Sequence, residues 1–533
     1  MATIATTVPS TIGGSLPRVD GPLKVSGAAM YASDHHFPGM LYAVPVCSTI
    51  GKGRISSLES SVAEQMPGVR AVYHRGNIGR LFRSAPAAGI SAYLDERRPP
   101  FEDDVIRYYG QYVAVVIAQT FEQAEAAAAA VKVSYSEEKP DVRTRLDTDE
   151  KPRVDSSRGD AERAFPGASI KLDETYGTPV ETHNPIELHA SVAVWDGESF
   201  TLYESSQAVV NHRDVLAQML GVPTENVRVI SRFLGSGFGS KLWPWPHSLL
   251  AAAASRNLSR PVKLVISRQM MFQNVGHRPR TQQRGRLSAT AEGKLTSLQH
   301  DYLNHTSILD DYEENCGEAT SYLYGTPNLR ITSGLVRRNI GTPTAMRGPG
   351  AVPGLFATES AMDELAIKLK LDPVELRLRN EPENDQSTGL PFSSRHLTEC
   401  LTLGARKFGW SQRTPQVVLM AATKAKKSPF AGPSTDALGF RNGRVYLKEQ
   451  APETGVVFQD ILEQSNINVA SGSGKSAGTF GSTEPRKYST HSFGARGIGE
   501  IGHAGIAAAL TSAVYHATGV RVRELPIRIE HLL

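Results

Sequence analysis

Apolar residues recur along the first part of the chain in runs typical of strands and of helices. Short runs rich in Val, Ile and Tyr at 40–48 and 112–120 predict strands. An alanine-rich segment that opens at Phe121 predicts a helix. After a tail over 1–19, these elements predict an α/β domain over 20–137.

Charged, proline-containing sequence over 138–163 interrupts this pattern and predicts a linker or a long surface loop. A second block follows over 164–406. There, an alternating run at 227–234, a glycine turn and a helix at 247–257 precede another strand at 261–268. This order predicts a strand, turn, helix and strand unit within an α/β domain.

The region after this unit contains residues that typically mark where helices begin and end. Gly and Pro recur every few residues over 338–354, which predicts a loop, and an apolar helical pattern follows over 355–370. Asp372 and Pro373, with Glu375 three residues after the Asp, predict an N-cap, a first-turn proline and a capping carboxylate. We therefore expect a second helix to begin at Pro373.

The last block, over 407–533, has a weaker pattern. The Gly-, Ser- and Lys-rich stretches 419–435 and 471–494 are closer to loops than to core. The end of the block predicts a helix over 505–519, with Gly519 just past its last turn.

Composition changes this picture little, but it excludes several classes. The chain has 533 residues, 58 Lys and Arg against 54 Asp and Glu, 40% hydrophobic residues and 21% charged residues. These values are typical of a soluble globular protein and exclude a disordered chain or a polybasic nucleic-acid binder. The length predicts two or three domains. No apolar stretch approaches the ~20 residues of a membrane helix, and no export signal is visible.

The three cysteines, Cys47, Cys316 and Cys400, have no CxxC spacing. They argue against a disulfide framework, a zinc ribbon, or an iron–sulfur cluster held by this chain alone. We therefore expect a cytoplasmic protein. A periplasmic location would need a partner that carries the export signal.

Two glycine-rich segments could contact a phosphate or a cofactor. The segment GSGFGSK, 235–241, matches neither the dinucleotide nor the phosphate-loop spacing. Its glycines could bring backbone N–H groups close to an anion at a helix N-terminus, or they could form a tight turn without a ligand. The segment SGSGKS, 471–476, lacks the first glycine and the helix of a phosphate loop, so we do not favour nucleotide binding.

A third glycine-rich segment, 494–505, contains one carboxylate ahead of the terminal helix. Glu500 could act as a general base, or it could only complement the helix dipole. With His503 it forms an ExxH pair, but a second pair is missing, so we discount a di-iron site. The histidines of 183–189 and 205–213 are typical of structural residues rather than metal ligands.

Taken together, these segments resemble the molybdopterin-binding large subunit of the xanthine dehydrogenase and aldehyde oxidase family. The segments 18–34 and 108–137 resemble the ends of that family's N-terminal α/β "hammerhead" domain. Four later segments then match, in order, the loops that surround the molybdenum: SSQAVVNHRDVLAQMLGVP (205–223), FLGSGFGSK (233–241), TAMRGPG (344–350) and GARGIGEIG (494–502). The resemblance implies a mixed α/β fold with a hammerhead domain over 20–137, a first molybdopterin-binding domain over 164–406 and a shortened second one over 407–533.

The resemblance also assigns roles to single residues. It implies that Gln207, Phe238 and Arg347 lie next to the molybdenum without being its direct ligands, and that Gly237 and Gly239 give backbone access to the cofactor. Glu500 occupies the position of the catalytic base.

The implied reaction is a hydroxylation with water as the oxygen source. Its two electrons must leave through iron–sulfur clusters and a flavin. The three cysteines of this chain cannot hold such clusters. We therefore expect a [2Fe–2S] subunit and an FAD subunit as separate partners, in a heterotrimer. The pterin could be the cytosine dinucleotide form that bacterial relatives often use.

Two further positions bear on the substrate. Xanthine-specific members have a Glu directly after the lysine of the glycine loop and a Phe after the Arg-Gly of the third segment. This chain has Leu242 and Pro349 there. The polar contact and the ring stack that hold a purine are therefore missing, which favours an aldehyde over an N-heterocycle.

Several family segments between the third and fourth motifs have no counterpart in this sequence: a G-Q-G loop, a serine-rich pterin-phosphate loop and a second glutamine segment. The sequence suggests internal deletions near 415–418 and at the junction of Gly494 and Ala495. The alternative hypothesis is therefore a truncated, non-catalytic remnant or binding subunit that no longer holds the cofactor.

Overall fold

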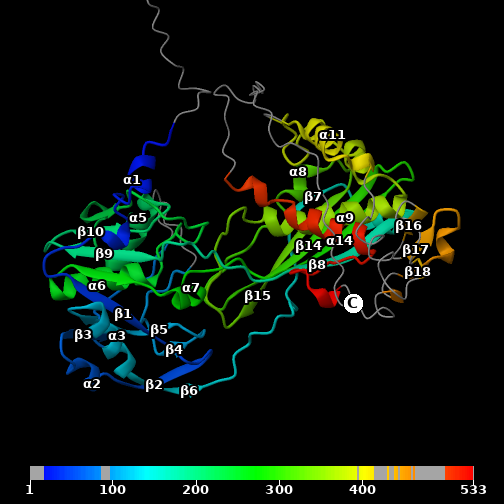
Figure 1. Cartoon of the computed structure of the whole chain (residues 1–533). Coiled ribbons are helices and arrows are strands. Elements are labelled where there is room, and N and C mark those ends of the chain that lie inside the picture. The colour runs from blue at the N-terminus through cyan, green and yellow to red at the C-terminus, as the bar shows by residue number, and fades with distance from the viewer. Residues whose placement is uncertain are drawn as a thin grey trace, which may run out of the picture.

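Two β-sheet bodies lie next to each other in the computed structural model of the chain (Figure 1). The structure describes residues 17–85, 96–392, 395–412, 429–430, 437–441, 444–457, 460–461 and 499–531.

A seven-stranded mixed sheet forms the first body. Its strands are, in spatial order, β11 (Val227–Ile230), β10 (Phe200–Glu204), β9 (Ala190–Trp195), β12 (Val262–Val265), β1 (Leu41–Cys47), β5 (Tyr112–Ala118) and β3 (Val69–His74). All seven residues of β5 are buried, which explains its unbroken apolar sequence. The strands predicted near 40–48, 112–120, 227–234 and 261–268 are confirmed, although β11 and β12 are not neighbours.

This sheet continues across the stretch that we expected to act as a linker. Strand β1 pairs in parallel with β12, with Leu41 opposite Val262, so strands from 41–118 and from 190–265 belong to one sheet. A smaller sheet, β4 (Val105–Ile106), β2 (Gly53–Glu59) and β6 (Lys132–Glu137), lies beside it. The N-terminal segment and the second block are therefore joined by backbone hydrogen bonds.

The main helices that pack against the first sheet are α3 (Phe121–Ala130), α5 (Val209–Leu220) and α6 (Pro246–Leu258). The helix predicted to open at Phe121 is confirmed, and Thr120 and Gln123 cap its start reciprocally. Residues 247–255 of α6 are all buried. The four alanines of this helix let its backbone lie close to the sheet, and the helix predicted at 247–257 is confirmed.

A five-stranded sheet forms the second body, in the spatial order β7 (Arg153–Arg158), β15 (Leu329–Arg338), β14 (Leu295–Ser307), β13 (Thr281–Ala289) and β8 (Ile170–Thr178). Strand β7 lies within the stretch expected to be a linker or loop, and that expectation is wrong for its last third. The strand lies at the sheet edge and is mostly exposed, so its sequence carries no apolar alternation.

Helix α9 (Ala351–Leu369) covers the second sheet through contacts with β13 and β8, and α14 (Ile506–Thr518) packs against α9. Helix α9 begins four residues before the predicted start at 355, because Pro353 is tolerated in its first turn.

Two helix-end predictions are confirmed here, although Glu375, predicted as the capping carboxylate, accepts a hydrogen bond from Arg379 Nε at 2.9 Å instead. Asp372 accepts hydrogen bonds from the N–H groups of Val374 and Glu375 at the start of α10 (Pro373–Arg379). Gly519, in the left-handed conformation, ends α14.

A small sheet of β16 (Leu438–Arg441), β17 (Arg444–Leu447) and β18 (Val456–Val457) lies at the far end of the second body (Figure 1). The Gly-, Ser- and Lys-rich stretch 471–494 and most of 419–435 lie outside the described residues. So do the segment 471–476 and the suggested junction of Gly494 and Ala495.

The other α-helices are α1 (Gly21–Val25), α2 (Ser61–Glu64), α4 (Ala161–Gly167), α7 (Arg268–Asn274), α8 (Thr320–Leu323) and α11 (Leu397–Phe408). Within the described ranges, no helix has the length and apolar character needed to cross a bilayer. The mixed α/β fold class is confirmed.

Candidate active site

The glycine loop 235–241 follows β11 and lies against Gln207. The backbone N–H groups of Gly239 and Lys241 donate to Gln207 Oε1, at 3.1 and 3.3 Å. These N–H groups therefore do not serve an anion, and α6 begins only at Pro246, so the loop does not form a helix N-terminus as expected. Because Oε1 faces the loop, the amide nitrogen of Gln207 points away from it.

Two glycines of the loop are required by close contacts. A Cβ atom at Gly237 would lie 2.2 Å from Gln207 Oε1, and one at Gly239 would lie 2.1 Å from the carbonyl oxygen of Ala345. Gly239 also has φ +110°, a conformation that other residues rarely adopt. Between them, Phe238 has φ +58° and leaves 37% of its surface exposed. The loop therefore holds an aromatic ring in a strained, outward position.

Arg347 connects the glycine loop to the C-terminal segment. Its N–H donates to the carbonyl oxygen of Phe238 at 2.9 Å, and its guanidinium lies 5.8 Å from the centre of the Phe238 ring. Its Nε donates to the carbonyl oxygen of Gly499 at 2.6 Å. A Cβ at the neighbouring Gly348 would lie 3.8 Å from the carbonyl oxygen of Glu500. The structure thus brings the second, third and fourth predicted segments together.

Glu500 lies in an exposed turn rather than at the N-terminus of a helix. A short 3₁₀ turn, Ile501–His503, follows it, and α14 begins only at Ile506. The expectation that the helix dipole acts on this carboxylate is therefore wrong, since the dipole's effect is confined to the first turn. Within the described part of the chain, no cluster of three or more His, Cys, Asp or Glu side chains could hold a metal ion.

A buried ion pair lies beneath the glycine loop. Lys241 is fully buried and its Nζ lies 2.7 Å from Glu187 Oε2 and 3.0 Å from the Glu187 carbonyl oxygen. The same carboxylate oxygen accepts the N–H of Gly235 at 2.7 Å. Burial lowers the pKa of Lys241, although Glu187 opposes this effect. Glu187 thus binds both ends of the loop.

A buried polar network lies behind Gln207. Ser206 and His212 are hydrogen-bonded at 3.1 Å, and His212 Nε2 lies 3.9 Å from Glu204 Oε1. Burial acts to raise the pKa of Glu204, but His247, His212 and Ser191 outweigh it and hold that pKa below its usual range. The pKa of His212 falls to about 4, because burial disfavours its cation.

The histidines of the two segments that we predicted to be structural are buried and hydrogen-bonded. His183 Nε2 contacts the carbonyl oxygen of Ala345 at 2.8 Å, and His189 Nε2 contacts that of Ser240 at 3.1 Å. Burial lowers the pKa of His183 to about 4. These side chains therefore support the two loops in their neutral form.

The two positions that bear on the substrate flank these loops. Leu242 is half-buried directly after Lys241, and Pro349 is exposed two residues after Arg347. Neither side chain has a polar group or an aromatic ring to hold a purine.

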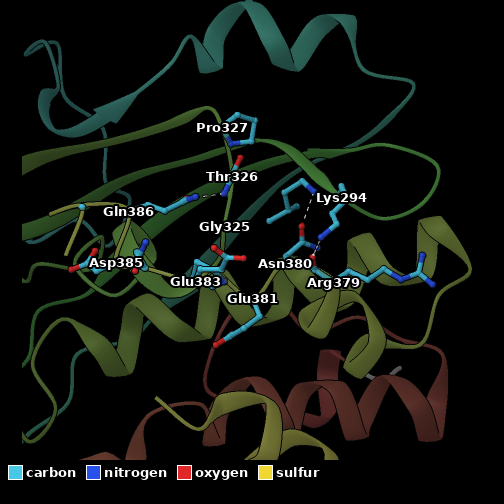
Figure 2. Close-up of a pocket in the computed structure, with 14 residues that line it drawn as sticks. Lys294, Gly325, Thr326, Pro327, Arg379, Asn380, Glu381, Glu383, Asp385 and Gln386 are labelled. Carbon is cyan, nitrogen blue, oxygen red and sulfur yellow. Dashed lines mark hydrogen bonds between the residues drawn. The ribbon is translucent and has the colours of Figure 1, made fainter. Parts of the chain in front are cut away.

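Figure 2 shows a pocket on the second body that does not include any of these residues. Several of its polar groups are already paired. Lys294 Nζ donates to the Arg379 carbonyl oxygen, Asn380 Oδ1 accepts the N–H of Leu295, and Gln386 Oε1 accepts that of Thr326. We therefore place the candidate site at the loops around Gln207, Phe238 and Arg347 instead.

Models of two protein families match the chain. Residues 26–139 match the "Aldehyde oxidase and xanthine dehydrogenase, a/b hammerhead domain", and residues 146–381 match the "Molybdopterin cofactor-binding domain". The "Nicotinate dehydrogenase large molybdopterin subunit" of Eubacterium barkeri is 30% identical over 69% of this chain and 89% of that protein. The chain belongs to the xanthine dehydrogenase and aldehyde oxidase family.

Other members of this family are also similar to the chain. The "Aldehyde oxidoreductase molybdenum-binding subunit PaoC" of Escherichia coli (strain K12) is 38% identical over 83% of this chain and 60% of that protein. The chain thus spans about 60% of that relative's length. Members of the family are molybdenum-binding oxidoreductases, and this chain carries the cofactor-binding domain.

Solved structures share the fold. The aldehyde oxidoreductase of Desulfovibrio gigas aligns with a TM-score of 0.67 and 23% identity, over 78% of this chain and 48% of that one. The CO dehydrogenase of Oligotropha carboxidovorans aligns with a TM-score of 0.68 and 22% identity, over 79% and 56% of the two chains.

Proposed function

We propose that this chain is the molybdenum-binding subunit of a hydroxylase that oxidises an aldehyde to the carboxylic acid, with water as the oxygen source. The observation that carries the proposal is the meeting of segments far apart in sequence. Gln207 contacts Gly239, Phe238 contacts Arg347, and Arg347 binds the turn that carries Glu500. By the resemblance of their segments to the family's loops, each of these residues would border the molybdenum.

The donors at these loops suit the cofactor. The Gln207 amide nitrogen points away from the glycine loop, and the Nε bond of Arg347 leaves both Nη groups for other acceptors. We propose that these two side chains and the Phe238 ring hold the metal end of the group, and that the absence of a side chain at Gly237 and Gly239 lets the group approach the loop backbone. When bound, the molybdenum cofactor supplies the two-electron oxidising power and activates the water-derived oxygen.

Glu500 is the proposed general base. Its carboxylate is exposed in the turn that Arg347 holds, so it can accept the proton that must leave the attacking oxygen. Arg347 contributes a fixed positive charge on the same side, where negative charge develops during the attack.

An aldehyde is favoured over an N-heterocycle as the substrate. Leu242 and Pro349 leave the site without the carboxylate and the ring that would hold a purine. The similarity to a subunit of an aldehyde oxidoreductase points the same way.

The electrons require partners. We propose a [2Fe–2S] subunit and an FAD subunit as electron acceptors in a heterotrimer, with the pterin as its cytosine dinucleotide. The three free cysteines of the chain are separate from one another in sequence and support a cytoplasmic location.

The test is Glu500→Gln in the complex purified with its neighbouring subunits. This change keeps the side chain's size and removes its basicity, so aldehyde oxidation should fall by at least about 100-fold with unchanged molybdenum content. Glu530→Gln, an exposed glutamate in the same C-terminal segment, is the matched control and should retain full activity. Unchanged turnover of the Glu500 variant would remove it from the base role.

A screen of aldehydes against N-heterocycles tests the substrate class. The proposal predicts turnover of aldehydes and none of xanthine. A wild-type complex that carries molybdenum but oxidises only heterocycles would contradict the proposed substrate.

A further inference from the structure

A buried arginine contacts the loop 344–350 from below. Arg278 is 3% exposed, and its Nη2 donates to two consecutive carbonyl oxygens, those of Met346 and Arg347, each at 2.7 Å. Its Nη1 donates to Glu181 Oε2 at 2.7 Å. One planar guanidinium therefore binds two backbone oxygens and a carboxylate at the same time.

The other end of the loop is held by a buried glutamate. Glu314 is fully buried, and its Oε1 accepts the N–H of Gly350 at 2.6 Å while its Oε2 accepts the Tyr312 hydroxyl at 2.9 Å. Arg278 Nε lies 3.6 Å from Glu314 Oε1. The two anchors of the loop are thus coupled to each other through opposite charges.

The loop 344–350 needs such contacts because it is not part of a helix or a strand over most of its length. Gly348 and Gly350 have φ of +72° and +68°, so the chain turns sharply at both positions and pairs with no strand there. A Cβ at Gly350 would lie 2.2 Å from the carbonyl oxygen of Asn315, so the loop is pressed against its neighbour. The carbonyl oxygens of Met346 and Arg347 lie outside any strand, and the Arg278 side chain supplies a donor to both.

The position of Arg278 is itself fixed. Its backbone pairs with that of Glu181 in both directions, with N–H to oxygen distances of 2.9 and 3.2 Å. Two residues along the chain from Glu181, His183 binds the Ala345 carbonyl oxygen. The segment that holds Arg278 therefore also holds the first part of the loop.

We propose that Arg278 is a positioning residue, which with Glu181 and Glu314 fixes the loop 344–350 so that the Arg347 side chain faces Phe238 and the Glu500 turn. This inference rests on the proposed function only for its effect on catalysis. The fixing of the loop is a property of the chain alone.

We expect the attraction between Arg278 and the buried Glu314 carboxylate to stabilise the loop as much as the hydrogen bonds do. Burial raises the pKa of Glu314, and Arg278 opposes this rise. An uncharged residue at 278 would thus remove both the guanidinium donors that bind the loop and the cation that stabilises the buried carboxylate. A lysine would keep the cation but could not bind two carbonyl oxygens and a carboxylate in one plane.

The test compares backbone hydrogen exchange over 342–354 in the chain without added cofactor. Arg278→Gln should accelerate exchange of the Arg347 and Gly350 amides at least tenfold, and Arg278→Lys should accelerate it less. Arg284→Gln is the matched control, because Arg284 lies on β13 in a half-exposed pair with Asp173 and should leave this peptide unchanged. If the Gln variant does not fold, the Lys variant carries the test, since it keeps a cation beside both glutamates.

A second measurement separates this inference from the proposed function. In the molybdenum-loaded complex, Arg278→Lys should lower kcat for aldehyde oxidation at least tenfold with unchanged metal content and little change in KM. Protection over 342–354 that is equal in wild type and both Arg278 variants would overturn the positioning role, whatever the activity. Faster exchange in a chain that binds no molybdenum would instead leave the positioning role intact and overturn only the proposed function.

Discussion

The two halves of the candidate site are held by different means. The half formed by Gln207 and the glycine loop rests on buried side chains, because the Lys241 and Glu187 pair lies beneath it and glycines fit its contacts. The half that carries Glu500 is an exposed turn, where Arg347 Nε binds the carbonyl oxygen of Gly499 and a Cβ at Gly502 would meet no atom of the described residues within 4 Å.

The buried half therefore supplies a rigid support, and the exposed half carries the proposed general base. The buried half can be formed before any ligand binds, since Gln207 Oε1, Lys241 Nζ and Glu187 Oε2 find partners within the protein. The exposed half has room for a large ligand and depends on Arg347 for its place. Substitutions should therefore cost more stability in the first half than in the second.

The largest effect is expected at the buried ion pair. Lys241→Met leaves the Glu187 carboxylate without its cation, which should lower the free energy of unfolding by about 3–5 kcal/mol. Lys52→Met, which breaks an exposed pair with Glu138, should cost less than about 1 kcal/mol. Chemical unfolding of both variants measures the contrast, and equal costs would contradict a special role for the buried pair.

The next effect is a dependence on pH at His183. The folded-state pKa is about 4 against 6.5 for an unperturbed histidine, so the unfolded state binds the proton first as pH falls. Stability is constant above pH 6.5 and declines between about pH 6.5 and 4, by about 3 kcal/mol for this group. Unfolding of wild type and His183→Gln from pH 8 to 4 should show a smaller decline in the variant. Parallel curves would refute the assignment.

A smaller effect is expected from two alanine substitutions at glycines. Gly239→Ala places a Cβ 2.1 Å from a backbone oxygen in a conformation that alanine rarely adopts, which should cost about 1–3 kcal/mol. Gly502→Ala meets none of the described residues within 4 Å and should change stability by less than about 0.5 kcal/mol. Thermal unfolding distinguishes them, and a similar cost at both glycines would mean that the two halves are equally well packed.

The smallest change in stability is expected for Arg347→Gln. It removes one hydrogen bond to Gly499 and a contact with the Phe238 ring, worth about 1 kcal/mol or less at this exposed position. Hydrogen exchange over 499–505 should nevertheless rise. Arg232→Gln, which removes a similar ring contact with Phe233, should leave exchange there unchanged. If Arg347→Gln also leaves it unchanged, the turn is held by other contacts.

Local signals in the sequence predicted much of the fold. The cap formed by Asp372 and Pro373, the left-handed Gly519 and the fully apolar β5 each follow from the residues themselves. Strand β7 could not be predicted, because an exposed edge strand needs no apolar alternation and is recognised only by its partner β15.

The candidate site likewise contains residues that the sequence predicted and residues that it did not. The order of four segments predicted that Gln207, Phe238, Arg347 and Glu500 would be neighbours, and their roles stay predictions. Arg278, Glu181 and Glu314 were not predicted, because each is an ordinary charged residue in sequence and its role depends on contacts across 36 or more positions. Charged side chains that are buried in pairs leave no local signal.

The most direct test of the account is the amount of molybdenum and pterin per chain in protein purified with its neighbouring subunits. The account predicts near-stoichiometric cofactor, held at the loops of Gln207 and Arg347, and a loss of cofactor in Gly239→Ala but not in Gly502→Ala. The absence of molybdenum from the wild-type chain, in cells that load a longer relative, would contradict it and favour a non-catalytic remnant.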